Sequence, residues 1–106
     1  MQELIDKVQE IVAFELERAN TIHPPKFNSM HEAYAVILEE LEEAECEIST
    51  FKGALEWSVW SNIKNDCYEM AYEGFKDIER IAIAAAAEMI QVAAVSRKAR
   101  GVSNVR

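Results

Sequence analysis

The sequence has few of the residues that interrupt or crosslink a chain. Three glycines and two prolines occur among 106 residues, and the two prolines are adjacent, at Pro24 and Pro25. The two cysteines, Cys46 and Cys67, form no pattern of paired short spacings, so neither a zinc site nor a disulfide framework is indicated. We expect both cysteines to be small buried residues in a reducing compartment.

Positive charge and long apolar runs are also scarce. Eleven Lys and Arg stand against 19 Asp and Glu, which argues against a DNA-binding surface because phosphate contacts require clustered cations. The most apolar stretch, residues 81–95, is shorter than the roughly 20 residues of a membrane span and contains Glu88. The N-terminus is acidic from the third residue, unlike a signal peptide. These features predict a soluble, cytoplasmic protein that binds neither nucleic acid nor membranes.

Apolar residues recur every three or four positions through most of the chain, which is the spacing of a helix face. No strand pattern competes with this spacing. The fold class predicted for residues 1–106 is therefore all-α, a single domain built as a four-helix antiparallel bundle. The predicted helices cover residues 2–20, Ser29 to near Gly53, about Trp60 to Gly74, and Ile78 to the basic segment 97–100.

Local signals predict where these helices begin and end. Pro24 and Pro25 stop the first helix because proline cannot donate a backbone hydrogen bond. Ser29 and Glu32 match a capping box at the start of the second helix. Gly53 leaves two possibilities open, a helix end or a kink in one longer helix. The tail 102–106 is expected to be frayed.

Self-association is expected from the composition. Half of the residues are hydrophobic but only 8% are aromatic, and the alanine-rich fourth helix fills little volume. Apolar stripes should then remain for a partner chain to cover, which predicts a homodimer or homotetramer. The four alanines at 84–87 would let another helix backbone approach closely. Trp57 and Trp60 are expected to be core or subunit-interface anchors in preference to a stacking platform for a nucleobase.

Two polar features interrupt the apolar faces. Glu40 and Glu43 lie one turn apart in the segment EELEEAECE at 39–47, and their stripe flanks the apolar face. Glu88 and Gln91 are three positions apart on the fourth helix. Oxygen donors without His or Cys suit Mg²⁺ or Mn²⁺, and a bundle that pairs the second and fourth helices could bring Glu88 toward the other two glutamates. The alternative is an acidic face in contact with water only.

Two stretches of the sequence resemble a known family. The pattern HEAYAVILEELEEAE at 31–45, with its EExxE core at Glu39, Glu40 and Glu43, and AEMIQVAAV at 87–95 are similar to small phage-type members of the MazG-like, all-α nucleoside triphosphate pyrophosphohydrolase superfamily. The resemblance implies an oligomeric cytosolic hydrolase that uses Mg²⁺, held by an EExxE helix and an ExxD helix, to cleave a nucleotide to its monophosphate and pyrophosphate. It makes Glu40, Glu43, Glu88 and Gln91 the metal ligands. Glu39 is the candidate base.

The sequence departs from the family pattern in two places. Gln91 stands where the family has Asp, which keeps an oxygen donor but removes a charge, and the two motifs are farther apart than usual. A second interpretation therefore stays open, a non-catalytic helical oligomer in which Glu88 is paired with a cation such as Arg80 of a neighbouring chain. The cations available to receive a triphosphate are Lys26, Lys52, Lys64, Lys76, Arg80, Arg97 and Lys98.

Overall fold

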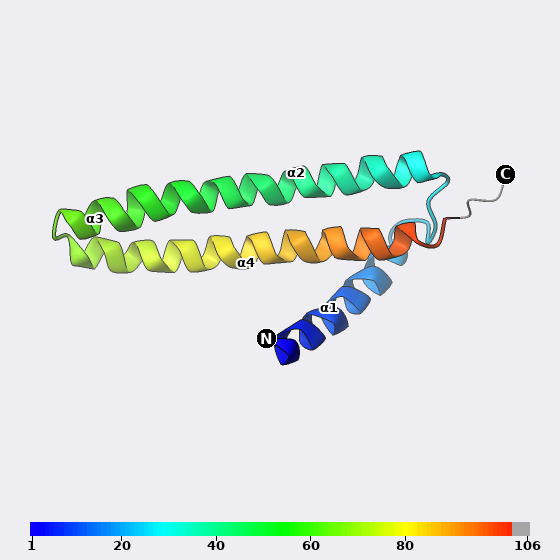
Figure 1. Ribbon diagram of the computed structural model, residues 1–106, viewed down its shortest axis with the longest axis horizontal. Coiled ribbons are helices and arrows are strands. Elements are labelled where there is room, and N and C mark those ends of the chain that lie inside the picture. Colours follow the sequence, from blue (N-terminus) through cyan, green and yellow to red (C-terminus); the bar gives the residue numbers. More distant parts are fainter. Residues whose placement is uncertain (103–106) are drawn as a thin grey trace. The chain divides into compact units, whose positions relative to one another are not determined.

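The computed structural model describes residues 1–102, and within this range the chain is all-α with no strand (Figure 1). The fold class predicted from the sequence is confirmed to this extent. The prediction of a frayed tail falls mainly on residues 103–106, which lie outside the described residues. The elements in chain order are α1 (Gln2–Asn20), α2 (Met30–Ala54), the π-helical segment η1 (Leu55–Trp60), α3 (Ser61–Lys64) and α4 (Tyr68–Ala99).

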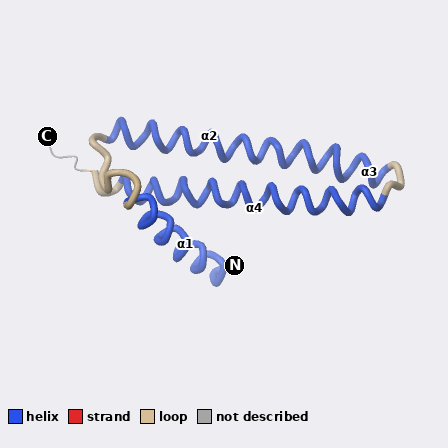
Figure 2. The backbone as a smooth tube through the Cα atoms, turned by 180° about the vertical axis from the view of Figure 1, so that it is seen from behind, coloured by secondary structure: helices blue, strands red, loops and turns tan. Residues whose placement is uncertain are grey.

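The chain divides into two compact units. The first unit contains Met1–Glu42 and the chain from Glu88 onward, and the second contains Glu43–Ala87. Three helical segments pack together in the first unit: α1, the N-terminal part of α2 and the C-terminal part of α4. The second unit is a helical hairpin, whose short connection between α3 and α4 is drawn in tan in Figure 2. The assignment of residues 1–106 to one domain stays a prediction.

The start of α2 follows the signal in the sequence. The backbone N–H of Glu32 donates to Ser29 Oγ at 3.1 Å, so Ser29 caps the helix as predicted. The Glu32 carboxylate accepts from the backbone N–H of Asn28 at 3.0 Å and from its side-chain amide at 3.2 Å. The glutamate therefore binds the residue before the cap, whereas a capping box would have it bind Ser29.

The predicted third helix is wrong, because Gly74 does not end a helix, and of the two possibilities left open at Gly53 the structure has the one longer helix. Gly53 lies inside α2, which continues through η1 and α3 to Lys64, and Gly74 lies inside α4. A Cβ atom at Gly74 would lie 2.8 Å from the backbone carbonyl carbon of Ser58 and 3.0 Å from Val59 Cγ2. Gly74 is thus a point of close approach between α4 and η1. The glycine that was predicted to end a helix is needed instead for packing against a segment distant in the sequence.

The helix break falls instead at residues 65–67, where no glycine or proline occurs. Asp66 adopts a left-handed conformation with φ of 59°. Its N–H donates to the Ile63 carbonyl at 3.1 Å, and the N–H of Cys67 donates to the Asn62 carbonyl at 2.8 Å. These two bonds form a Schellman motif, in which an aspartate takes the position usually held by glycine. The described residues therefore form three long helical stretches separated by loops, where the sequence predicted four.

The buried core is thin and made mostly of small residues. Ala84 and Ala85 of the alanine run are only half-buried, and Ala86 and Ala87 are exposed. Both cysteines are exposed, so the prediction that they are buried is wrong: Cys46 occupies an exposed position of α2, and Cys67 lies in the turn before α4. The buried hydrophobic residues are Val12, Ala33, Ala44, Val59, Ala71, Ile81 and Ala94.

Many large apolar side chains stay in contact with solvent. The apolar stripe predicted for residues 2–20 exists, but only Val12 is buried, and Leu4 is 59% exposed. Trp57 and Trp60 are 72% and 56% exposed, so they are not core residues of the chain. No helix among residues 1–102 combines the length and the apolarity needed to cross a bilayer.

Candidate metal centre

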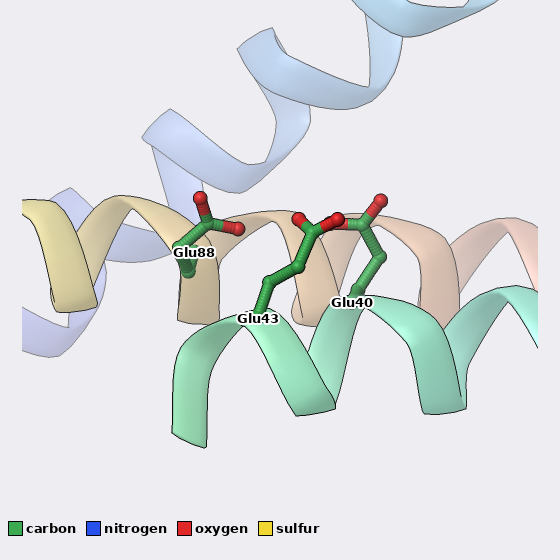
Figure 3. Close-up of side chains that lie close together, drawn as sticks. All are labelled: Glu40, Glu43 and Glu88. Carbon is green, nitrogen blue, oxygen red and sulfur yellow. The ribbon is translucent and has the colours of Figure 1, made fainter. Parts of the chain in front are cut away.

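Carboxylates from α2 and α4 lie close together. Glu40 and Glu88 are both half-buried residues of the first unit, and an oxygen of one lies within 4.8 Å of an oxygen of the other. Glu43 follows Glu40 by one turn of α2, is exposed, and places an oxygen within the same distance of Glu40. Figure 3 shows the Glu40 side chain on α2 and the Glu88 side chain on α4 close together, with Glu43 one turn along α2 from Glu40.

The donor set of this acidic cluster (Glu40, Glu43 and Glu88) suits a hard divalent cation. Mg²⁺ holds oxygen ligands at about 2.0–2.1 Å, so two oxygens on one ion are at most about 4.2 Å apart. Oxygens within 4.8 Å of each other reach that separation after a side-chain movement of well under about 1 Å. Glutamates of like charge this close repel each other, and a cation reverses the sign of that interaction. Surface carboxylates also gather where no metal binds, so the cluster alone does not establish one.

Gln91, the fourth ligand expected from the resemblance, has a contact that the sequence did not predict. It is half-buried on α4, one turn after Glu88, and its side-chain amide lies near the carboxylate of Glu15 on α1 and lowers the pKa of that group. Arg18 binds the same carboxylate, with Nε donating to Oε2 at 2.9 Å and Nη2 donating to Oε1 at 2.6 Å. The role of Gln91 as a metal ligand stays a prediction.

The Glu15 carboxylate is held in its charged form by these neighbours. The hydrogen bond from Arg18 lowers the pKa of Glu15 most, partial burial opposes this by raising it, and the charge of Arg18 and the Gln91 amide lower it further. Reciprocally, Glu15 raises the pKa of Arg18. The pair is therefore fully ionised at neutral pH.

A pocket of about 460 Å³ lies within the first unit, a volume typical of small-molecule sites. It includes Glu40 of the acidic cluster, the candidate base Glu39, and Gln91. The residues that line it come from α1, the loop 21–29, α2 and α4. They are Glu15, Leu16, Arg18, Ala19, Ile22, His23, Pro24, Lys26, Phe27, Asn28, Glu32, Val36, Glu39, Glu40, Gln91, Ala94, Val95 and Lys98.

Cations also line this pocket. Lys26 and Lys98 were among the expected phosphate-binding residues, and Lys98 Nζ lies 4.6 Å from the centroid of the Phe27 ring. Arg18 was missed because its position in the pocket depends on how α1 packs in the first unit. The only local signal was its spacing of three residues from Glu15, just before the loop with the two prolines. The other expected cations do not line this pocket: Lys52, Lys64, Lys76, Arg80 and Arg97.

Comparison of the chain with protein-family models, with curated proteins and with solved structures finds no match. The resemblance of residues 31–45 and 87–95 to the MazG-like superfamily therefore stays a prediction. Its functional implications depend on the acidic cluster and the pocket beside it.

Proposed function

We propose that the protein is a Mg²⁺-dependent nucleoside triphosphate pyrophosphohydrolase, with Mn²⁺ able to replace Mg²⁺. The observation that carries this proposal is the position of Glu40, which belongs both to the acidic cluster and to the wall of the pocket. A metal bound by Glu40 would therefore border a cavity large enough for a small molecule. Cationic side chains line the same cavity, as a polyphosphate requires.

The residues around the pocket have separate tasks in this proposal. Glu40, Glu43 and Glu88 would hold the metal, which when bound would supply the positive charge that neutralises phosphate oxygens and activates water for attack on phosphorus. Glu39, exposed on the pocket wall, accepts the proton of that water. Lys26 receives phosphate oxygens, and the apolar part of the wall receives the nucleoside. The apolar residues of the wall include Leu16, Ile22, Phe27, Val36 and Val95.

Metal binding tests the proposal without requiring knowledge of the nucleotide. Mn²⁺ titration followed by electron paramagnetic resonance should show binding to the natural chain. In Glu40→Gln the affinity should fall by at least about tenfold, since even residues that only support a metal ligand contribute that much. Glu45→Gln is the matched control, because it removes the same charge from an exposed position of α2 outside the cluster. Equal Mn²⁺ affinity in the two variants would refute the metal centre.

We also propose that the protein works as a homodimer or homotetramer. A groove on the first unit is lined almost entirely by apolar residues, most of them exposed, and a second copy of the chain would complete a helical bundle over it. Sedimentation at micromolar concentration should show an assembly, and a well-folded 12.0 kDa species alone would contradict it. The groove is lined by Met1, Leu4, Ile5, Val8, Gln9, Val12, Ala93 and Arg97.

The alternative function, a non-catalytic helical oligomer, gives a different combination of results. It predicts assembly without Mn²⁺ binding, and it requires a partner-chain cation near Glu88. Within its own chain, Arg80, the candidate for that role, lies 3.9 Å from Asp77 in a solvent-exposed ion pair. Exposed ion pairs of this kind are weak, so the pair with Asp77 would not prevent Arg80 from binding a carboxylate of another chain.

A further inference from the structure

The pocket is lined by an ion pair in which the guanidinium of Arg18, a side chain well suited to bind anions, is bound to Glu15. Arg18 and Glu15 both line the pocket, and the guanidinium binds the carboxylate through two hydrogen bonds, from Nε at 2.9 Å and from Nη2 at 2.6 Å. The Glu15 side chain is 16% exposed, and the Arg18 side chain is 48% exposed. The Glu15 side chain is thus mostly covered, while the Arg18 side chain remains accessible from solvent.

Carboxylates and phosphates bind a guanidinium with the same geometry. Both accept two parallel N–H bonds from the planar fork of an arginine, which makes arginine the preferred residue for either group. Glu15 occupies one of the two edges of the Arg18 guanidinium that donate paired N–H bonds, the edge formed by Nε and Nη2. A phosphate entering the pocket would also meet the negative charge of that carboxylate at close range, so the two anions compete for one cation.

Gln91 supplies a second polar neighbour for Glu15. Its side-chain amide, on α4, lies near the carboxylate and lowers the pKa of Glu15, and it comes from a helix other than the one that carries Arg18. If Glu15 gave up Arg18, its carboxylate would therefore still have an N–H donor group beside it. An aspartate at position 91 would lack this N–H donor and would add a second negative charge beside Glu15. The amide of Gln91 is thus suited to stabilise the Glu15 carboxylate, a role that the resemblance did not suggest.

We propose that the Glu15–Arg18 pair is a latch on the pocket: Arg18 is the receptor for a phosphate group of the ligand, and Glu15 is an internal competitor that passes to Gln91 when the phosphate binds. The inference rests on the proposed function, because that function supplies the phosphate. It goes further by assigning one phosphate-binding residue and by predicting that the loss of an acidic side chain improves binding.

Calorimetric titration of the full chain with inorganic triphosphate, in excess Mg²⁺, tests the latch. Glu15→Gln should bind triphosphate more tightly than the natural chain, by roughly tenfold, because the competing charge is gone. Arg18→Gln should bind more weakly by about tenfold or more. Glu17→Gln is the matched control, because it removes the same charge from an exposed position of α1 outside the pocket, and it should stay within about twofold of the natural chain.

The double variant Glu15→Gln/Arg18→Gln separates a latch from a general change in charge or packing. In a latch the gain from Glu15→Gln exists only while Arg18 is present, so the double variant should bind as weakly as Arg18→Gln alone. Circular dichroism of each variant checks that the helices are intact. Equal affinity of Glu15→Gln and Glu17→Gln, undiminished binding by Arg18→Gln, or no binding of triphosphate by any of the proteins would overturn the latch.

These results are distinct from a failure of the proposed function. If nucleotide cleavage depends on Glu40 but Glu15→Gln behaves like Glu17→Gln, the latch is wrong and the hydrolase stands. If the triphosphate affinities follow the predicted order but no nucleotide is cleaved and Glu40→Gln binds triphosphate normally, the latch stands and the hydrolase is wrong.

Discussion

The two helical glycines provide a matched pair of substitutions with opposite expected effects. Alanine is favoured over glycine in a helix interior by about 1 kcal/mol. No atom lies within 4 Å of a Cβ built at Gly53, so Gly53→Ala should raise the free energy of unfolding by about that amount. At Gly74 the same methyl group would lie 2.8 Å from the Ser58 carbonyl carbon, closer than real Cβ atoms approach.

Because that neighbour is backbone, α4 and η1 must move apart locally to admit the methyl group. Overpacking of this kind typically costs about 1–3 kcal/mol, which exceeds the gain in helix propensity. Gly74→Ala should therefore lower the free energy of unfolding by about 1–2 kcal/mol, whereas Gly53→Ala raises it. Urea denaturation followed by circular dichroism, at one fixed chain concentration, measures both. If Gly74→Ala were as stable as Gly53→Ala, the close approach of α4 to η1 would be refuted.

Three further substitutions test local features. Ser29→Ala should lower the free energy of unfolding by about 1 kcal/mol through loss of the α2 cap, measured by urea denaturation, and no change would exclude the cap. Asp66→Val should lower it by about 1–2 kcal/mol, because a β-branched residue is strained at a φ of 59°, and unchanged stability would contradict this turn. Since the pKa of Glu15 is lowered in the folded chain, its stabilisation is present above the unfolded pKa of about 4.3 and is lost as the pH falls through the lower folded value. The Tm of the natural chain should thus exceed that of Glu15→Gln at neutral pH and converge with it in acid, and a constant difference would refute the ion pair.

Local sequence signals predicted the helix boundaries that depend on local physics. Ser29 caps α2 through a hydrogen bond three residues along the chain, and α1 ends before the two prolines. Gly74 was misleading because a glycine that relieves a helix contact looks the same in sequence as one that ends a helix, whereas Gly53 has no atom near its Cβ position and its sequence context left a longer helix open. The turn at Asp66 carries an aspartate in place of glycine, so its break signal was weaker than that of Gly53 or Gly74.

The candidate site divides in the same way. Glu40 and Glu43 are neighbours because they are three positions apart on one helix. The carboxylate of Glu88 comes close to that of Glu40 because α4 packs beside α2 in the first unit. The contact of Glu15 with Gln91 joins α1 to α4, and nothing in the spacing of either residue indicates it. Polar contacts between distant helices depend on how the helices are rotated about their axes, which apolar periodicity fixes only coarsely.

Pyrophosphate release from a panel of common nucleoside triphosphates in Mg²⁺ tests the central claim most directly. The natural chain and Glu45→Gln should release pyrophosphate from at least one of them. Glu88→Gln should release none while keeping its helical circular dichroism, because the amide preserves the shape of the side chain and removes a charge that the metal needs. Release by Glu88→Gln at the rate of the natural chain, or no release by the natural chain from any nucleotide in the panel, would contradict the proposed function.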